Sequence, residues 1–299
     1  MDVDRYITES FFFTRDALVR GWQRWLVLVL LGIPWALLTS LLTSRGVYEG
    51  MRIHWSLVPW TESALIIVSG IVCDLLLTGY LVRLLRGGKT VPGFDRPSGL
   101  LLDGIRAGTI PLVWIFVPLI LFLSGTTLVA AGYLGSFAAW VVLAALVIVG
   151  IILVFFAVNY IVIGTVRFAR TGSVREAFNL PAIKGIFDRI GLVNYYIGLG
   201  VIALVFAVVT AFLNLLALVP YIGPVLILLL SPLLTVYCAR FIAHFCDEDL
   251  QPLTRQAEAL PPGAWIKEVA VWGIALLVLT VLCFTPLVLV LGAVGNLVP

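Results

Sequence analysis

The sequence predicts an all-α integral membrane protein with about seven transmembrane helices, and three observations lead to that class. The 299 residues are 62% hydrophobic and only 12% charged, with a mean hydropathy of +1.12. The apolar residues form runs, each long enough for the ~20 residues that a helix needs to cross the hydrocarbon core. The charged residues gather between these runs, as they do at the ends of membrane spans. A soluble domain would need a far more charged exterior.

In chain order, the predicted spans occupy residues 25–43, 63–84, 109–131, 135–164, 193–218, 223–245 and 267–291. Residues 4–20 precede the first span and mix aromatic side chains with charged ones. That mixture predicts an amphipathic helix, which lies either in the membrane interface or as a soluble cap on the bundle. We expect a six-span membrane domain over residues 1–245, and a cytoplasmic connector with an additional seventh span over residues 246–299.

The positions of Lys and Arg predict how the chain crosses the membrane. All but two of the 19 basic residues lie before the first span, between the second and third, between the fourth and fifth, or after the sixth. The exceptions are Arg45 and Arg52. Because cytoplasmic loops carry the excess of positive charge, we expect the N-terminus in the cytoplasm and, with seven spans, the C-terminus outside. The plasma membrane is the expected location.

A polar corner after the second span recurs after the fourth. Residues 83–97 align without gaps with residues 167–181, and both copies lead from the inner end of one span into the next. The matched pairs are Arg83 and Arg167, Arg86 and Arg170, Gly88 and Gly172, Phe94 and Phe178, Asp95 and Asn179, and Pro97 and Pro181. Because both copies start at the inner end of a span, the repeats are parallel and not inverted. A third, degraded copy is predicted to start at Arg240.

Each corner is predicted to continue as an amphipathic helix along the cytoplasmic interface. In the first copy this re-entry helix covers residues 95–106. In the second copy, Ser173 and Glu176 have the spacing of a capping box. Ile183 and Ile186 then begin one apolar helical face.

The corners also carry a resemblance. The segments GYLVRLLRGGKTVPGFD, LLLDGIRAG and VPYIGPVLILLLSPLLTVYCARF resemble a mainly archaeal family of multi-pass membrane proteins, catalogued as a domain of unknown function (number four-zero-one-three). The likeness covers roughly the first 245 residues. The family pattern is matched by Tyr80, Arg83, Pro92, Asp95, Asp103 and Gly104. The resemblance implies a bundle that usually has six spans, so the predicted seventh span departs from it. The resemblance implies no catalytic residue.

Asp74 is the one carboxylate well inside a predicted span. Gly70 and Thr78 lie four residues to either side and give that helix a narrow face of small and polar residues, which we expect to pack against another helix. Asp74, Asn159 and Ser231 each precede an inner arginine of a corner by eight or nine residues. These three residues form a candidate intramembrane polar cluster that lines a proton or solute path. The alternative, which we favour, is hydrogen bonding that fixes the packing of the bundle.

Arg83, Arg86, Arg167 and Arg170 recur as Arg-x-x-Arg at the predicted inner surface of the membrane. They are candidate contacts for anionic lipid headgroups or for an anionic solute. Anchoring and orientation of the spans would produce the same charges, and we favour that interpretation.

The sequence favours a non-enzymatic bundle that scaffolds partners or organises lipid. It has two histidines and no HExxH, Gly-x-Ser-x-Gly or GxxxxGK[ST] motif, so no catalytic, cofactor or metal site is predicted. The alternative is a small-solute or lipid transporter or permease subunit that uses the polar cluster around Asp74. Expected partners are membrane lipids and a membrane protein or second copy of the chain. Nucleic acid is not expected, because the basic residues flank spans.

Overall fold

The computed structural model describes residues 3–49, 52–88, 91–130, 136–217, 219, 222–246 and 266–280. Its elements are α1 (Val3–Thr14), η1 (Arg15–Val19), α2 (Trp22–Ser44), β1 (Tyr48–Glu49), β2 (Arg52–Ile53), η2 (Trp55–Leu57), α3 (Trp60–Leu85), α4 (Pro97–Ala130), α5 (Ser136–Thr171), η3 (Val174–Phe178), α6 (Leu180–Ile190), α7 (Leu192–Ala217) and α8 (Ile222–Phe245). Residues 266–280 form a further helix. Apart from the short antiparallel hairpin of β1 and β2, the regular structure in the described residues is helical.

Six helices are long and apolar enough to cross a membrane, so the predicted class of all-α multi-pass membrane protein is confirmed. They lie at Trp22–Ser44, Trp60–Leu85, Pro97–Gly125, Phe137–Thr171, Leu192–Leu216 and Ile222–Phe245. These helices correspond to the first six predicted spans. Of the predicted seventh span, the structure describes the part up to residue 280 as helix, and residues 281–291 lie outside the described residues.

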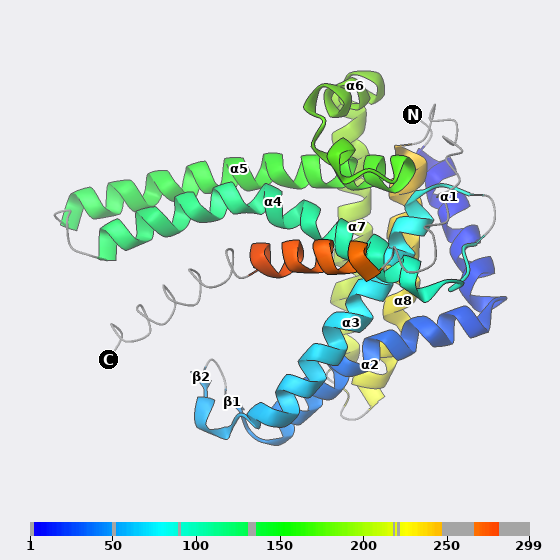
Figure 1. Cartoon of the computed structure of the whole chain (residues 1–299), viewed down its shortest axis with the longest axis horizontal. Coiled ribbons are helices and arrows are strands. Elements are labelled where there is room, and N and C mark those ends of the chain that lie inside the picture. The colour runs from blue at the N-terminus through cyan, green and yellow to red at the C-terminus, as the bar shows by residue number, and fades with distance from the viewer. Residues whose placement is uncertain are drawn as a thin grey trace. The chain divides into compact units, whose positions relative to one another are not determined.

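The chain divides into two compact units. Unit 1 comprises Met1–Gly104 and Lys184–Thr254, and unit 2 comprises Ile105–Ile183 and Arg255–Pro299. Within unit 1, α2 and α3 form a hairpin whose far end carries β1 and β2 (Figure 1). Helix α8 contacts α1, α2, α3 and α7. It also has the largest buried share of the six candidate spans, 33%, so it is the central helix of unit 1.

The core of unit 1 gathers at those ends of its helices that the sequence predicts to be cytoplasmic. It is formed by Ala17, Leu18, Leu28, Tyr80, Leu84, Leu100, Val236 and Ala239. At the opposite end of α3, the apolar side chains of Leu65 and Val68 are exposed by 70% and 62%. Exposed apolar side chains are stable where lipid surrounds a helix. The firm packing of unit 1 therefore lies at its basic end.

The corner of residues 86–96 ends in a close crossing of two helices. A Cβ added to Gly79 in α3 would lie 1.9 Å from the carbonyl oxygen of Leu100 in α4. A Cβ added to Gly104 would lie 1.8 Å from the carbonyl oxygen of Leu75. Only glycine allows the two backbones to approach this closely, so these two positions fix how α3 crosses the first turns of α4.

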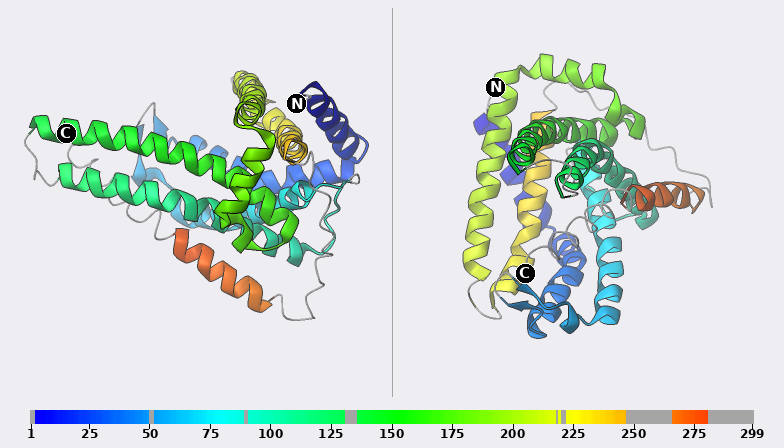
Figure 2. Two further views of the ribbon diagram at one scale, coloured as in Figure 1. Left: turned by 90° about the horizontal axis from the view of Figure 1, so that it is seen from above. Right: turned by 90° about the vertical axis from the view of Figure 1, so that its left-hand side faces the viewer.

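Unit 2 contains most of α4, all of α5, η3 and the helix of residues 266–280. Figures 1 and 2 show α4 and α5 side by side along most of their length. Helix α5 has 36 residues and is about 54 Å long at ~1.5 Å per residue. It is therefore longer than a hydrocarbon core of ~30 Å, in agreement with its prediction as the longest span. The 3-10 turn η3 packs back on α5.

The two corners continue differently, and one prediction is wrong. The first re-entry segment is no separate interfacial helix, because α4 begins at Pro97 and runs unbroken to Ala130. After the second corner, α6 is separate and ends before Gly191, whose φ is 79°. On α6, Ile183 and Ile186 are 0% and 5% exposed, while Lys184 is exposed. The predicted apolar face of α6 is thus confirmed.

The N-terminal segment is helical, as predicted, and packs on α8. The ring of Tyr6 meets Phe241 edge-on at 6.3 Å between centroids. The guanidinium of Arg240 lies 4.2 Å from the ring centroid of Phe13. On the other side of α1, Phe11 is 58% exposed. Helix α1 is therefore amphipathic and carries an exposed aromatic face.

Candidate functional site

Asp74 lies in the middle of α3 and binds the neighbouring helix α2. The indole Nε1 of Trp35 donates a hydrogen bond of 2.9 Å to Asp74 Oδ2. Gly70, one turn before Asp74, makes room for the same ring, since a Cβ there would lie 3.0 Å from Trp35 Cε2. The remainder of the Asp74 side chain is exposed on the surface of the structure. The polar face of α3 thus contacts α2 through one tryptophan.

The other two residues of the predicted polar cluster bond within their own helices. Ser231 Oγ donates to the Leu228 carbonyl at 3.4 Å, and Asn159 Nδ2 donates to the Phe155 carbonyl at 2.5 Å. Asp74 and Ser231 belong to unit 1, and Asn159 belongs to unit 2. Within the described part of the chain, no hydrogen bond joins any two of the three. Each of these side chains has a local partner.

Arg83 holds the chain segment that follows it. Its Nη1 donates to the carbonyl oxygens of Gly93 and Asp95, at 3.0 and 2.7 Å. Its Nη2 donates to the carbonyl of Arg96 at 3.3 Å. Arg96 has a φ of 58°, a left-handed conformation that is costly for a residue with a side chain. The guanidinium therefore satisfies the carbonyls of Gly93 and Asp95, which precede α4, and adds a donor to the Arg96 carbonyl, which also accepts from the backbone of Gly99 and Leu100.

The same corner is closed by two further contacts. The Tyr80 ring is fully buried and stacks on Phe94 at 4.6 Å between centroids. Arg86 Nη2 forms an ion pair of 2.7 Å with Asp103 Oδ2, near the start of α4. Residues that carry the family pattern in the sequence thus shape the turn between α3 and α4.

The second corner has its own arginine contact. Arg167 donates through Nη2 to the Glu176 carboxylate and through Nε to the Glu176 carbonyl at 3.3 Å. The hydrogen bond from Arg167 is the main reason that the pKa of Glu176 is lowered from 4.5. The predicted capping box is wrong, because Glu176 binds this guanidinium and the Ser173 side chain makes no cap. Instead, Asn179 Oδ1 accepts from the Ala182 backbone at 3.3 Å and caps the start of α6.

Three of the four arginines predicted to contact lipid are therefore bound to the chain itself. Arg83, Arg86 and Arg167 hold the corners through the contacts above. Arg170 is half-buried in the last turn of α5. These contacts give Arg83, Arg86 and Arg167 a structural role whether or not lipid is bound.

A basic cleft opens in unit 2, where side chains from three chain segments meet. It has a volume of about 650 Å³, and its lining includes Arg106, Arg175, Lys267, Glu268 and Trp272. We call these five residues the basic cleft. Arg106 comes from α4, Arg175 from η3, and the other three from the helix of residues 266–280. Three cations and one carboxylate give the cleft an excess of positive charge.

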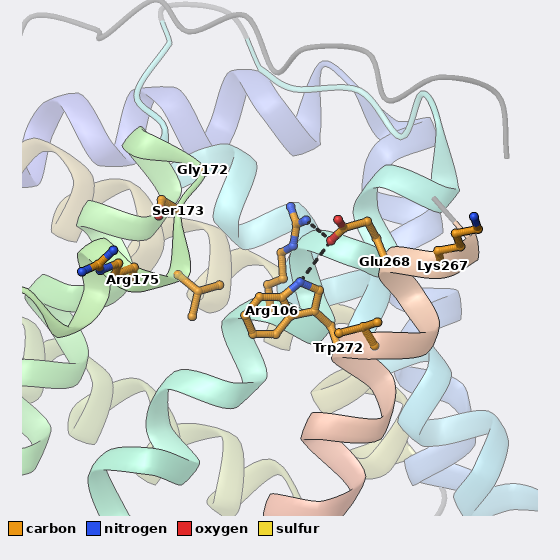
Figure 3. A pocket seen from close by; sticks show the side chains of 9 residues that line it. Arg106, Gly172, Ser173, Arg175, Lys267, Glu268 and Trp272 are labelled. Atoms are coloured by element: carbon orange, nitrogen blue, oxygen red, sulfur yellow. Dashed lines mark hydrogen bonds and ion pairs between the residues drawn. The ribbon is translucent and has the colours of Figure 1, made fainter. Parts of the chain in front are cut away.

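One ion pair forms the centre of the basic cleft (Figure 3). Arg106 Nη2 lies 2.6 Å from Glu268 Oε2, and Trp272 Nε1 donates to the same oxygen at 3.2 Å. The Arg106 guanidinium also lies 5.8 Å from the centroid of the Trp272 ring. Figure 3 shows Arg175 and Lys267 on opposite sides of this centre. Both are exposed, and neither makes a hydrogen bond or ion pair with the described residues.

The sequence does not single out the basic cleft. Its three cations are far apart in the chain, and no motif in the sequence joins them. The one available signal is the positive-inside rule, which predicts all three on the same side of the membrane. Their meeting around one cleft agrees with that prediction.

The next possible sites are clusters of metal-binding side chains and the cysteine thiols. Among the described residues, no group of three or more His, Cys, Asp or Glu side chains is placed to hold a metal ion. Cys73, Cys238 and Cys246 are free thiols, and Cys283 lies outside the described residues.

Comparison with known proteins places the chain in a family. Residues 63–218 match the model of a family described as a protein of unknown function (DUF4013). That match covers about half of the chain. The chain belongs to this family. No curated protein and no solved structure matches the chain.

The DUF4013 region includes both corners but only part of the basic cleft. It begins in α3 and ends just beyond α7, and is thus shorter than the resemblance suggested. Arg83, Arg106, Arg167 and Arg175 lie inside it. Lys267 and its helix lie beyond it, so this chain completes the cleft with a segment from outside the matched region.

Proposed function

We propose that this DUF4013 protein is a non-enzymatic membrane bundle that organises anionic lipid at the cytoplasmic face of the plasma membrane. The observation that carries this proposal is the meeting of three basic chain segments around one cleft, with Arg175 and Lys267 exposed. The positive-inside rule assigns that face to the cytoplasm. The cytoplasmic leaflet holds the anionic lipids that basic residues attract.

The contacts of the corner arginines support this proposal, because they fix the turns that lie next to exposed basic residues. Arg83 and Arg167 each fix a turn through the backbone that follows them. The ends of the neighbouring helices are thereby held in place, as are the exposed basic residues close to them. The non-enzymatic part of the proposal rests on the sequence, which has no HExxH, Gly-x-Ser-x-Gly or GxxxxGK[ST] motif.

Extraction of the protein together with its surrounding lipid tests this function. The full chain is taken from the membrane in polymer-bounded discs, and the co-extracted lipids are compared with the bulk membrane. We expect anionic phospholipids to be enriched about twofold or more, since each basic residue near an anionic surface contributes about 1 kcal/mol. A composition equal to that of the bulk membrane would overturn the proposal.

The alternative is a transporter that uses Asp74, and one observation favours it. The Asp74 side chain is partly exposed in the middle of an apolar helix, where a carboxylate is costly unless it faces water or protein. In proteoliposomes, a transporter predicts pH-dependent solute flux that Asp74→Asn abolishes without loss of fold. Lipid organisation predicts the same lipid enrichment for Asp74→Asn as for the unaltered protein.

A further inference from the structure

We propose that the basic cleft binds the phosphodiester headgroup of one anionic phospholipid, such as phosphatidylglycerol, and orients its acyl chains along the helix of residues 266–280. The inference rests on the proposed function and deepens it, since it gives one site and one class of ligand. The ligand must combine a negative phosphate with a long apolar tail. The cations of the basic cleft match the phosphate, and an apolar strip on the helix of residues 266–280 matches the tail.

The phosphate is recognised by the cations of the cleft. Arg106 uses Nη2 for its bond with Glu268, while its Nη1 makes no hydrogen bond to the described residues. Arg175 and Lys267 flank it on either side (Figure 3), and their long exposed side chains can turn toward an anion between them. Arginine and lysine N–H groups form the strongest hydrogen bonds with phosphate oxygens, because the bonds are charge-assisted.

The acyl chains are matched by an apolar strip that starts at the cleft. Val271 lines the cleft and is 64% exposed. Ile274 and Leu277 follow at helical spacing and are each 63% exposed. Lys267 precedes Val271 by four residues and Ile274 by seven, so the strip begins on the same face of the helix as this cation. Trp272 lies at the boundary, where tryptophan is common in membrane proteins. A free phosphate would leave this strip unused, so the site favours a lipid.

The carboxylate of Glu268 limits the affinity of the cleft. It neutralises Arg106 at 2.6 Å and would lie near the bound phosphate, which it repels. Glutamine at this position keeps an oxygen that can accept from Arg106 and Trp272 but removes the negative charge. We therefore expect Glu268→Gln to bind the lipid about fivefold more tightly, from about 1 kcal/mol per charge at the surface. A purely structural ion pair predicts no such gain.

Lipid retention by charge variants tests the inference. The full chain is exchanged into mild detergent with equal phosphatidylglycerol and phosphatidylcholine, and bound lipids are counted by native mass spectrometry. Arg175→Gln with Lys267→Gln should lower phosphatidylglycerol retention more than tenfold. The matched control, Lys184→Gln with Arg189→Gln, removes the same charge from exposed positions of α6 and should change retention less than twofold. Equal losses in both double variants would overturn the site.

Two further outcomes separate the possible failures. If the unaltered protein retains the two lipids equally, the proposed function fails together with the site. If phosphatidylglycerol is preferred but the Arg175/Lys267 variant retains it fully, the function stands and the site is wrong.

A second experiment tests a soluble phosphate: glycerol phosphate is added to lipid-free protein in detergent, and the Tm is measured. A rise in Tm that depends on Lys267 and equals the rise caused by the lipid would show a free-phosphate site and overturn the lipid assignment.

Discussion

At the scale of single residues, Asp74 shows how a costly group in a span is stabilised. Its carboxylate accepts the only hydrogen bond that Trp35 Nε1 makes in the described structure, at 2.9 Å. A buried or lipid-facing indole N–H without an acceptor loses a hydrogen bond that water cannot replace. The pair therefore joins α2 to α3, and its removal should weaken that hairpin.

Trp35→Phe tests this pair, because it keeps an aromatic ring beside Gly70 and removes the donor. We expect a loss of about 1–2 kcal/mol in the free energy of unfolding, measured by denaturant titration in mixed micelles. Asp74→Asn keeps an acceptor oxygen and should cost less than about 1 kcal/mol. If Asp74→Asn costs more than Trp35→Phe, Asp74 acts through something other than this hydrogen bond.

Glu176 gives a second residue-scale prediction, which concerns pH. Arg167 lowers the pKa of this carboxyl from 4.5, with smaller contributions from Asn179 and Arg175. Because the pKa is lower in the folded state, the unfolded state binds the proton first as the pH falls. The stability from this pair is therefore complete above about pH 4.5 and is lost as the pH falls through the lower, folded pKa.

Thermal unfolding between pH 6.5 and pH 3.5 measures this loss. The unaltered protein should lose more stability over that range than Glu176→Gln, which has no carboxyl to titrate. Glu62→Gln is the matched control, since Glu62 is exposed and makes no ion pair in the described residues. A Glu176→Gln profile parallel to that of the unaltered protein would contradict the assignment.

At the scale of elements, two glycines determine how α3 and α4 meet. Any side chain at Gly79 or Gly104 would collide with a backbone carbonyl, of Leu100 or Leu75 respectively. A carbonyl in a helix cannot rotate away as a side chain can, so the helices must separate. The contacts of Arg83 with the corner depend on that crossing, because the corner joins the same two helices.

Gly79→Ala and Gly104→Ala should each destabilise the protein by about 2–3 kcal/mol or more. Gly200→Ala is the control, because it lies in helix α7 and a Cβ there meets nothing within 4 Å. Alanine has the higher helix propensity, so this control should be neutral or stabilise by up to about 1 kcal/mol. Unfolding midpoints in detergent compare the three. Equal midpoints would show that the helices separate at little cost.

The corners also show what the sequence could and could not predict. Apolar run length predicted the six described spans, because a helix in lipid must be long and apolar. The contacts of Arg83 could not be predicted, since its acceptors are backbone carbonyls, which every residue carries. Spacing alone suggested a capping box at Glu176, and a charged donor nine residues earlier took that carboxylate instead. The basic cleft depends on packing between distant segments, for which the sequence carries no local pattern.

At the scale of the whole molecule, the placement of charge predicts the direction in which the chain crosses the membrane. From the positive-inside rule we expect the basic corners and the basic cleft on one side of the membrane and the β1–β2 hairpin on the other. The proposed lipid site depends on this orientation, because the anionic lipids that it would bind are concentrated in the cytoplasmic leaflet.

Single cysteines in a cysteine-free background test the orientation. Ser56→Cys, in the exposed turn η2, should react with an impermeant maleimide in intact cells. Ser173→Cys, exposed after α5, should react only after the membrane is permeabilised. The reverse pattern would place the basic cleft outside and exclude the cytoplasmic leaflet as the source of its lipid.

A third cysteine, placed after Pro299, reports on the predicted seventh span. Seven crossings bring it to the same side as Ser56→Cys, and six crossings bring it to the side of Ser173→Cys. The outcome also bears on the basic cleft, because Lys267 and Val271 lie at the start of that span. If the segment crosses, the apolar strip from Val271 to Leu277 runs into the hydrocarbon, as acyl chains bound at the cleft require. A C-terminus labelled only after permeabilisation would contradict the crossing.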